Sequence, residues 1–539
     1  MKKTWWAVQR FYALHFPANV LAAWRVHNEQ LLPFLRWFGR TKTFRVAHPN
    51  QLQTDKSLLR LMQSVLLATY AAGGALLWKW VTQGTVGSWA FGLAIIIGGP
   101  LLLVTLFVIC AVVIRSLYYV IHPKLLGKAI VANILESQVI RLRQKHRFTV
   151  VAVAGSVGKT STKLATAQLL GQNVRVQYQS GNYNDRVTVP LIFFGQEEPP
   201  LLNPFAWMRV FGEIAASLHH PYPYDVVVIE LGTDKPGQMQ RFAYTRPDIT
   251  VLTAVAPEHM AYFGTLEAVA AEETKVFDYS GFVLVNADAV APKLLVGRSS
   301  TTYSLRKGSA HGYYAESSRV NLGGQFLQIQ TPSGVIDAHT KLVGQQGASS
   351  VLAAAAVADM LGLKHASIAE AIKELEPSAG RIQVLDGIKN SKLIDDTYNS
   401  SPIAVKAALD VVYGSRATQR IAVLGSMNEL GAYSKEAHTE VGSYCEPNKL
   451  DFVLTLGSDS QRWLAPSARK NGCVVHSFSS QTACAAFVRK HLKTGAVVLV
   501  KGSQNGVFAE EVVKQLLAHP RDANKLVRQS SYWLRRKAK

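Results

Sequence analysis

Residues 89–114 read WAFGLAIIIGGPLLLVTLFVICAVVI, a stretch without a single charged side chain. It is long enough to cross a bilayer as an α-helix, which needs about 20 apolar residues. Residues 58–80, LLRLMQSVLLATYAAGGALLWKW, form a second and slightly more polar segment of this kind. Because lipid offers backbone N–H and C=O groups no partner, we predict a transmembrane helical hairpin over residues 58–120, kinked at Pro100.

Charged residues set the orientation of this hairpin. Arg and Lys flank its outer ends, in RTKTFR (residues 40–45) before it and in IRSLYYVIHPKLLGK (residues 114–128) after it, whereas the connecting turn VTQGTVGS is uncharged. The positive-inside rule places such flanks in the cytoplasm. We therefore predict a multi-pass protein of the cytoplasmic membrane, with both termini and the later domains cytoplasmic. The alternative is a buried helical hairpin of a soluble domain.

The charge of the chain is unbalanced, with 58 Lys and Arg against 36 Asp and Glu and a formal net charge of +22. The basic residues gather at the two ends, in residues 1–57 and in the tail KLVRQSSYWLRRKAK, where they mix with aromatic residues. Such interfacial segments suit an anionic membrane surface, because cations meet the headgroups and rings sit at the boundary. Membrane lipid is the predicted partner. Nucleic acid is less favoured, because bilayer-spanning segments follow directly.

From residue 121 onward, short apolar runs alternate with helical patterns. Residues 121–146 are predicted to form a linker helix, and strands follow at FTVVAVAG, YDVVVIELG, DITVLTAV and SGFVLVNAD. Residues 303–342 alternate more loosely and suggest a small β addition. A second series of strands, SKLIDDTY, RIAVLGSM, DFVLTLG, CVVHSF and AVVLVKGS, begins after EPSAGR. This alternation predicts an α/β protein with parallel sheets, a central domain over residues 147–380 and a Rossmann-like C-terminal domain over residues 381–539.

A glycine-bearing turn joins the first of these strands to a helix, in VVAVAGSVGKTSTKLATAQLL. Glycines let backbone N–H groups converge on phosphate oxygens at a helix N-terminus. Lys159 can reach the β- and γ-phosphates of ATP, and the Thr160 hydroxyl can bind Mg²⁺. The usual spacing also requires a glycine at position 153, where this chain has Val153, so the loop is a shorter G-[ST]-x-G-K-[ST] variant. The central domain is thus predicted to be of P-loop ATPase type, with ATP bound by Gly155, Ser156, Val157, Gly158, Lys159, Thr160 and Ser161.

Several segments resemble the Mur ligases, which are ATP-dependent amide-forming enzymes of peptidoglycan synthesis. The short loop, SGNYNDRVTVPL, VVVIELGTDKPGQM and APEHMAYFGTLEAVA are similar to motifs of the family's central domain and occur in the family's order. GRIQVL, LIDDTYNSSPIAVKAAL, VLGSMNELGAYSKEAHTEVG and VLVKGS resemble the C-terminal half of the branch that adds D-Ala-D-Ala. The resemblance covers about residues 150–517.

The resemblance implies roles for residues of the central domain. Glu230 ends an apolar strand, where a buried carboxylate needs a cation such as Mg²⁺, although an N-cap or surface carboxylate is the alternative. His259 would contact a second metal, whereas a lone histidine is more often structural. Asn182 and Asn184 either bind substrate or phosphate or only form a turn. The implied catalytic residues are Lys159, Glu230 and His259, and the implied metal ligands are Thr160, Glu230 and His259.

The C-terminal domain contributes a second set by the same resemblance. Asp396 would face the ribose of ATP, with Tyr398 and Asn399 near the adenine. Arg381 lies at the domain junction, where a guanidinium can grip phosphate when the domains close. Lys501 ends a strand, and it either binds the carboxylate of an anionic acceptor substrate or is a surface lysine.

Three departures from the family pattern stand out. Many Mur ligases carry a carbamylated lysine where this chain has Glu273, which supplies the same negative charge without carbon dioxide. The D-Ala-D-Ala-adding branch has an aspartate where this chain has Ser426. That branch also begins with a domain that holds the UDP-sugar of its substrate, and here the basic, membrane-spanning segment stands in its place.

The resemblance implies a membrane-anchored, ATP-dependent ligase that makes an acyl phosphate from a carboxylate and then joins it to an amine. The expected substrates are a peptidoglycan precursor and an amino acid or dipeptide, and the expected cofactors are ATP and Mg²⁺. The tether either reaches a lipid-linked substrate or brings the chain to membrane-bound cell-wall enzymes. Two alternatives stay open: a ligase of the same superfamily for another polyamide or amino acid substrate, and a membrane scaffold that binds ATP without catalysis.

Overall fold

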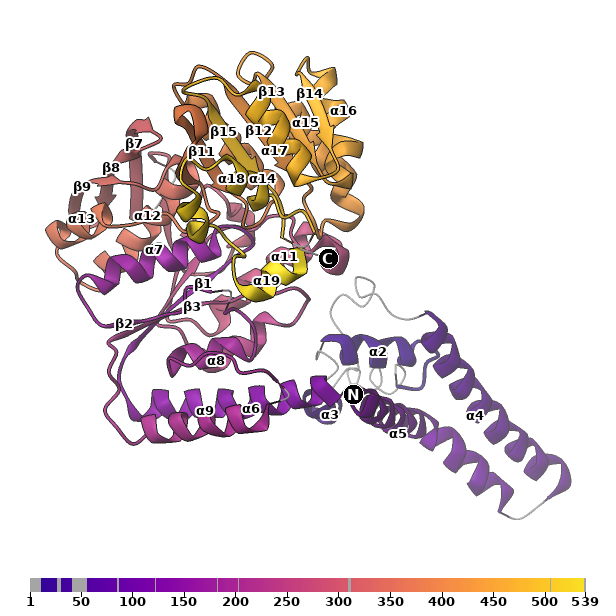
Figure 1. Cartoon of the computed structure of the whole chain (residues 1–539). Coiled ribbons are helices and arrows are strands. Elements are labelled where there is room, and N and C mark those ends of the chain that lie inside the picture. Colours follow the sequence, from indigo (N-terminus) through magenta and orange to yellow (C-terminus); the bar gives the residue numbers. More distant parts are fainter. Residues whose placement is uncertain are drawn as a thin grey trace. The chain divides into compact units, whose positions relative to one another are not determined.

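The structure is a computed structural model, and the contacts within it divide the chain into an N-terminal unit of residues 1–129 and a C-terminal unit of residues 130–539 (Figure 1). Each unit is described by itself. The described residues are 11–26, 31–40, 56–84, 87–121, 123–181, 183–201, 203–308, 312–504 and 506–537.

The N-terminal unit is built on a helical hairpin of α4 (Lys56–Gln83) and α5 (Ser88–Ile121). Two stretches of it, Leu58–Gln83 and Ser88–Val113, are long and apolar enough to cross a membrane. Only 17% and 22% of their most apolar windows are buried. A core helix of a soluble protein would be mostly buried, whereas most of the apolar surface of these two windows is exposed. Pro100 lies inside α5, as predicted.

Small residues let the two helices of the hairpin approach closely. A Cβ atom added at Gly73 would lie 2.8 Å from the carbonyl oxygen of Gly92, and one added at Gly92 would lie 2.7 Å from the carbonyl oxygen of Gly73. Close packing at small residues is typical of helices inside membranes, because lipid provides no hydrophobic driving force for helix association. Larger side chains at either glycine would separate α4 from α5.

Part of the predicted interfacial segment packs on this hairpin. It forms α2 (Phe16–Val26) and α3 (Leu31–Arg40). Phe16 and Val20 are buried in one cluster with Leu66 and Leu103 of the hairpin. The segment therefore contributes to the core of the N-terminal unit, and the rest of residues 1–57 lies partly outside the described residues.

The predicted linker helix is α6 (Pro123–Lys145), and its C-terminal half belongs to the central domain. Val139 and Leu142 are buried in the core on one face of the central sheet. The Arg143 guanidinium donates to the carbonyl of Phe148 at 2.7 Å and to the carboxylate of Asp248 at 3.2 Å. These contacts attach α6 to the sheet, so it is more than a spacer.

Among the described residues, nine strands form the central sheet in the order β2-β3-β1-β4-β5-β6-β7-β8-β9. Pairing is parallel from β2 to β7 and antiparallel among β7, β8 and β9, which form the β addition predicted over residues 303–342 together with β6. The strands are β1 (Thr149–Ala154), β2 (Val176–Gln177), β3 (Val226–Glu230), β4 (Ile249–Leu252), β5 (Phe282–Asn286), β6 (Thr301–Ser304), β7 (Gly312–Asn321), β8 (Gly324–Thr331) and β9 (Gly334–Thr340).

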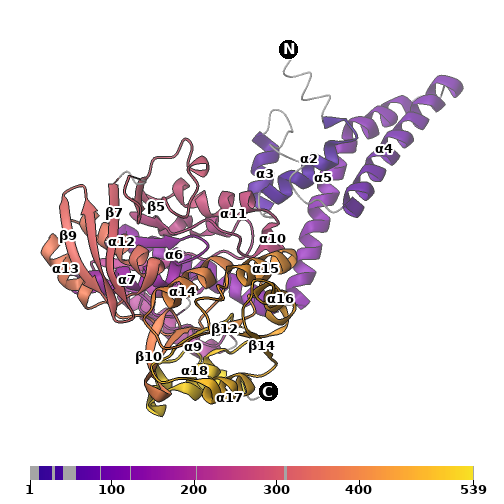
Figure 2. The ribbon, with the colours of Figure 1, turned by 90° about the horizontal axis from the view of Figure 1, so that it is seen from above.

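Helices cover both faces of this sheet, which is why its strands are apolar on both sides. Val151 and Val153 of β1 face a core shared with α7 and α12, which lie side by side in Figures 1 and 2. Val150 and Ala152 face the opposite core, which α6, α8 and α11 cover. The helices are α7 (Lys159–Gly171), α8 (Thr188–Phe193), α9 (Pro204–Ser217), α10 (Met260–Phe263), α11 (Leu266–Glu273), α12 (Gly344–Met360) and α13 (His365–Lys373).

A second sheet follows, with the described strands in the order β10-β11-β15-β12-β13-β14, parallel except for β10. It confirms the predicted second α/β series, with α14, α15 and α16 on one face and α17 and α18 on the other. The strands are β10 (Gln383–Gly387), β11 (Ser391–Asp396), β12 (Arg420–Gly425), β13 (Phe452–Leu456), β14 (Val475–Phe478) and β15 (Val497–Lys501). The helices are α14 (Pro402–Gly414), α15 (Ser434–Tyr444), α16 (Ala465–Lys470), α17 (Gln481–His491), α18 (Glu510–Leu516) and α19 (Ser531–Lys537).

Candidate functional site

The carboxyl ends of three neighbouring strands assemble the first half of the site. The turn that begins at Gly155 follows β1, Glu230 ends β3, and His259 follows β4, and β3, β1 and β4 are adjacent in the sheet. The carboxyl edge of a parallel sheet is where α/β proteins bind ligands. Parallel pairing therefore brings together residues that lie more than a hundred positions apart in the chain.

The turn after β1 requires glycine at its first position. Gly155 has a φ of 118°, and a Cβ atom there would lie 2.6 Å from the Thr253 hydroxyl and 2.8 Å from the Ala254 backbone nitrogen. Gly158, with a φ of 89°, precedes the first residue of α7. Both conformations are ones that only glycine adopts without strain. The residues after Gly155 in this turn and the N-terminal residues of the 13-residue helix α7 line the cavity.

Lys159 is a buried cation among carboxylates. Its ammonium group donates to the carbonyls of Gly155 and Ser156 and lies 3.5 Å from a carboxylate oxygen of Glu258. Burial alone would lower the pKa of Lys159, but the negative charges of Glu258, Glu273 and Glu230 outweigh it and raise the pKa above its usual value. Lys159 is therefore fully charged near neutral pH.

Glu230 is buried at the centre of a polar cluster. One carboxylate oxygen accepts from the Thr160 hydroxyl at 3.2 Å and from the Asn184 side-chain amide at 3.5 Å. The other lies 3.3 Å from the Lys163 ammonium and accepts no well-formed hydrogen bond. Burial lowers the pKa of Lys163, against the opposing effect of Glu230. Lys163 was not singled out from the sequence, although it lies one helical turn after Lys159 on α7.

Glu273 contacts the turn after β1 (residues 155–160) directly. It accepts from the backbone N–H of Gly155 at 2.9 Å and from the Thr233 hydroxyl at 3.3 Å. Burial raises its pKa to about 7, although Lys159 opposes the shift. The predicted substitute for a carbamylated lysine thus lies beside the loop.

His259 adopts a left-handed backbone conformation, with a φ of 49°, at the N-cap of α10. Its ring nitrogens lie 3.4 Å from an oxygen of Asp234, 3.6 Å from one of Glu258 and 3.3 Å from one of Glu429. Glu429 follows β12 in the C-terminal domain. The histidine therefore joins acidic groups of both domains, a role that the sequence did not predict.

The C-terminal domain forms the second half of the site. Asp396 ends β11 and Lys501 ends β15, and the two residues are paired in register. The Lys501 ammonium lies 2.5 Å from an Asp396 carboxylate oxygen and donates to the Asn399 carbonyl at 3.0 Å. Both side chains are buried. Lys501 is thus not a surface lysine, and its charge is already matched by Asp396.

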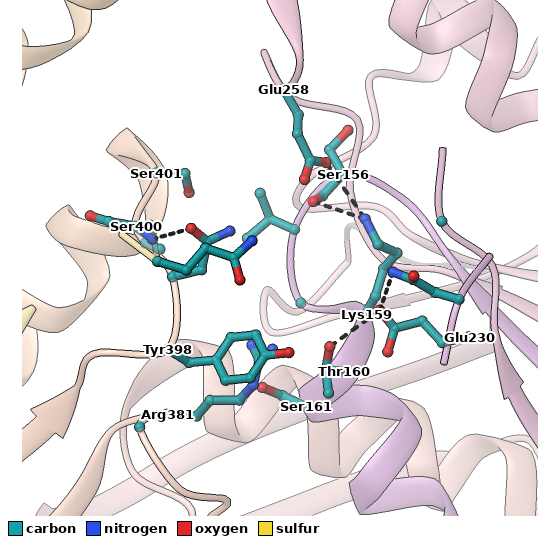
Figure 3. A pocket seen from close by; sticks show the side chains of 18 of the residues that line it. Ser156, Lys159, Thr160, Ser161, Glu230, Glu258, Arg381, Tyr398, Ser400 and Ser401 are labelled. Atoms are coloured by element: carbon teal, nitrogen blue, oxygen red, sulfur yellow. Dashed lines mark hydrogen bonds and ion pairs between the residues drawn. The ribbon is translucent and has the colours of Figure 1, made fainter. Parts of the chain in front are cut away.

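The two halves line one cavity of about 840 Å³. Figure 3 shows Arg381 and Tyr398 on one side and Lys159, Thr160 and Ser161 on the other. The Arg381 guanidinium lies over the Tyr398 ring, 4.1 Å from its centre, a cation–π contact that orients both groups. The cavity residues that the sequence had singled out are Ser156, Val157, Gly158, Lys159, Thr160, Ser161, Asn184, Glu230, His259, Arg381, Asp396, Tyr398, Asn399 and Lys501.

Few of the predicted residues lie elsewhere. Gly155 does not line the cavity, because it packs against Thr253 and Ala254. Asn182 lies outside the described residues. Glu258, Asp234 and Glu429 line the cavity and were not predicted.

Comparison with known protein families adds two matches to this geometry. The Mur ligase middle domain matches residues 212–358, and the Mur ligase glutamate ligase domain matches residues 380–504. Together the matches cover half of the chain and lie in the same order as the two α/β domains. The chain belongs to the Mur ligase family. It is therefore an ATP-dependent ligase of the kind that joins an acid to an amino acid.

Relatives of this Mur ligase include two enzymes named UDP-N-acetylmuramoyl-tripeptide–D-alanyl-D-alanine ligase. The one from Escherichia coli is 29% identical over 70% of this chain and 78% of its own, and the one from Synechocystis is 28% identical over 70% and 76%. The solved MurF structures from Acinetobacter baumannii and Thermotoga maritima, the latter with ADP, share the fold. They have TM-scores of 0.60 and 0.59, identities of 20% and 21%, and cover 71% and 73% of this chain and 80% and 84% of their own.

One departure of this Mur ligase from the family pattern has a structural use. Ser426 is buried, and its hydroxyl accepts from the backbone N–H of Ser460 at 3.2 Å. A Cβ atom at Gly457 would lie 2.6 Å from the same hydroxyl oxygen. Ser426 therefore helps to hold the turn after β12 against the turn after β13, and it does not line the cavity.

The basic tail packs against the rest of the C-terminal domain, near Tyr398. The Arg528 guanidinium donates to the carbonyls of Thr397 and Tyr398 and pairs with buried Glu510 at 2.7 Å. Lys537 pairs with the same carboxylate at 2.9 Å. Burial alone would raise the pKa of Glu510, but the two cations hold it below its usual value. These basic residues of the tail therefore act within the Mur ligase, whereas the sequence suggested a membrane surface.

We predict that Arg528→Ala raises the KM for ATP about tenfold, because each hydrogen bond to a charged group contributes about 1.5–3 kcal/mol and the Thr397–Tyr398 turn loses its anchor. Arg528→Lys should recover part of this loss. Arg535→Ala is the matched control, because Arg535 is exposed on the same tail. Steady-state kinetics of the full chain checks this, and an unchanged KM would show that the tail does not hold the turn.

A second prediction concerns pH. Because burial raises the pKa of Glu273 from 4.5 to about 7, the folded chain binds more protons than the unfolded chain between these values. The free energy of unfolding of the ligand-free protein should therefore fall as pH rises from about 4.5 to 7, by up to about 3 kcal/mol from this group. Glu273→Gln should remove this dependence. Thermal unfolding at pH 5 and pH 8 checks it, and equal pH dependence in both proteins would contradict it.

Proposed function

We propose that this Mur ligase is anchored in the membrane and joins the carboxylate of a peptidoglycan precursor to the amine of a D-Ala-D-Ala-type dipeptide. One observation carries the proposal: the phosphate loop of the central domain and the Asp396–Asn399 turn of the C-terminal domain line the same cavity. The names of its relatives supply the substrates, a UDP-N-acetylmuramoyl-tripeptide and D-alanyl-D-alanine.

ATP would lie across the cavity. The N–H groups of the turn after β1, the N-terminus of α7 and the Lys159 ammonium surround the position of the β- and γ-phosphates. Arg381 and Tyr398, held together by their cation–π contact, would bind the phosphate tail and the adenine. Asp396 would face the ribose, with Lys501 keeping its carboxylate in place.

The residues present fit Mg²⁺. Glu230 offers a buried carboxylate: one oxygen accepts from the Thr160 hydroxyl at 3.2 Å, and the other, 3.3 Å from the Lys163 ammonium, accepts no well-formed hydrogen bond. Carboxylate and hydroxyl oxygens are ligands that Mg²⁺ prefers. Among the described residues, no three His, Cys, Asp or Glu side chains converge closely enough to hold a metal alone. The cation would therefore depend on phosphate oxygens as well, and it would supply charge neutralisation to the triphosphate. His259 would add a ligand for a second ion.

Lys159 and the loop serve the first step. A carboxylate oxygen of the precursor forms a bond to the γ-phosphorus of ATP, the bond from that phosphorus to the β–γ bridging oxygen breaks, and ADP leaves with the electron pair. Two anions must meet in this step, so a cation and N–H donors at the phosphate lower its barrier. The dipeptide amine then attacks the acyl carbonyl, phosphate leaves, and the amine gives up a proton. Closure of the two domains around the cavity would keep water from the acyl phosphate.

The proposal of a membrane anchor is supported by α4 and α5, which have an exposed apolar surface and a close contact between Gly73 and Gly92. A tether confines the ligase to the membrane surface and raises the local concentration of any precursor found there.

The test uses the full chain, purified in detergent, with Mg-ATP and the two candidate substrates. Phosphate should be released only when precursor and dipeptide are both present, and mass spectrometry should find the joined product. A UDP-linked and a lipid-linked precursor, compared side by side, identify which form is used. Phosphate release without substrates, or ATP binding without any release, would contradict ligation and favour a scaffold. If alkaline carbonate extracts the chain from cell membranes, the proposed membrane anchor is wrong.

A further inference from the structure

Helices α6 and α9 lie side by side at the edge of the C-terminal unit and run in the same direction (Figure 1). In the middle of α6, Leu135 is buried in one cluster with Trp207 and Val210, which lie near the N-terminus of α9. Near their C-termini, the Lys145 ammonium donates to the carbonyl of Leu218. Over the part of α6 that belongs to the C-terminal unit, the two helices therefore run in the same direction.

The first half of each helix carries an apolar outer surface. Trp207, Val210 and Ile214 form the buried face of α9, and yet Phe205 is 80% exposed and Met208 is 68% exposed on the opposite side. On α6, Ile130 and Ile134 are also exposed. We call these four residues, Ile130, Ile134, Phe205 and Met208, the apolar patch. Large apolar side chains exposed together on two neighbouring helices are typical of an interaction surface.

The surface beyond the patch is basic. Arg141 of α6 is exposed and lines a shallow groove between the helices together with His219, whereas the exposed Arg209 of α9 is paired with Glu213. The acidic residues of the two helices are matched by cations: Glu213 lies 3.4 Å from Arg209, and Glu136 lies 2.5 Å from Arg186. An apolar end followed by basic side chains is complementary to the surface of an anionic bilayer.

The path of the chain also indicates the membrane surface as the partner of the patch. The second candidate membrane span ends at Val113, and α6 begins soon after it, at Pro123. The short connection keeps the N-terminal end of α6 close to the membrane surface at which the span ends. Ile130 and Ile134 of the patch follow within the first half of α6, whereas the second half carries a single exposed large apolar side chain among the described residues, Ile140.

We infer that the apolar patch rests on the cytoplasmic face of the bilayer, with Phe205 and Met208 inserted at the boundary between headgroups and acyl chains. The inference rests on the membrane anchoring proposed above and extends it. The chain would then touch the membrane with its catalytic unit as well as through its spans.

The experiment places a polarity-sensitive fluorophore on the full chain in vesicles of equal parts phosphatidylcholine and phosphatidylglycerol. Cys110→Ser removes the one exposed cysteine among the described residues, since the other three are buried. Met208→Cys then carries the label. Val474→Cys is the matched control, because Val474 is exposed and apolar but precedes β14 at the edge of the C-terminal sheet. We expect headgroup nitroxide lipids to remove most of the fluorescence at position 208 and none at position 474, with aqueous iodide showing the reverse.

A second variant tests the patch as a unit. Phe205→Ser with Met208→Ser should expose a label at Ile134→Cys to iodide, while phosphate release with water-soluble substrates stays unchanged, because neither residue lines the cavity. Equal iodide quenching at positions 208 and 474 would overturn the inference. So would shielding at position 208 that disappears when the protein is diluted in the vesicles, which would identify a second copy as the occupant. A chain that integrates into vesicles but fails these tests refutes the patch alone, whereas one that never integrates refutes the anchor.

Discussion

Replacing Lys159 with alanine is expected to lower the turnover number of the ligase about 100- to 1,000-fold, the usual cost of removing one preorganised group that stabilises charge in a transition state. Lys159 is the cation closest to the loop carbonyls, where it donates to Gly155 and Ser156. Its neighbours Glu258, Glu273 and Glu230 cannot replace it, because all three are acidic. The charge that develops on the transferred phosphoryl group would then be left without its main protein partner.

The measurement is single-turnover phosphate release from Mg-ATP by the full chain with both substrates. Lys159→Arg keeps the charge but moves it, so it should be nearly as slow as Lys159→Ala. Lys275→Ala is the matched control, because Lys275 is half-exposed in the same domain and, among the residues that the structure describes, pairs with Asp278 alone, at 3.4 Å. Thermal unfolding of each variant separates loss of function from loss of fold. Turnover within a few-fold of the unsubstituted enzyme would refute the role of the loop.

Replacing Lys501 with methionine is expected to lower the free energy of unfolding by about 3–5 kcal/mol, because it leaves the buried Asp396 carboxylate without its cation. The two groups are 2.5 Å apart, with side chains 2% and 9% exposed. Ligase activity should be lost as well, since Asp396 and the Asn399 carbonyl that Lys501 also holds line the cavity.

Denaturant unfolding checks this value, and the chain offers a close control. Lys392 and Asp386 form a 2.6 Å pair between the neighbouring strands β11 and β10, but both side chains are about half exposed. Lys392→Met should therefore cost at most about 1 kcal/mol. Asp396→Asn combined with Lys501→Met should regain much of the lost stability without restoring activity. If Lys501→Met and Lys392→Met lower the free energy of unfolding by the same small amount, the buried pair contributes little to the stability of the fold.

Local pattern was sufficient for much of the fold. The uncharged run before Val113, the alternation of apolar strands with helices, and the turn from Gly155 to Thr160 each depend on side chains close together in the chain. Such features report local physics: apolar length, strand and helix periodicity, and the need for glycine at a positive φ. The strand pattern could also mark Glu230, His259 and Lys501 as residues that end or follow strands, whereas the roles of His259 and Asp396 came from the resemblance to the Mur ligases.

What those candidates touch was decided by the tertiary structure alone. Parallel pairing of β11 with β15 puts Lys501 on Asp396, and docking of the C-terminal tail puts Arg528 on the Tyr398 turn. Lys163 became part of the site only because β3 brings Glu230 beside α7. A charge has no fixed partner in a sequence, because its energy depends on distance and burial, and both are set by contacts between residues far apart in the chain.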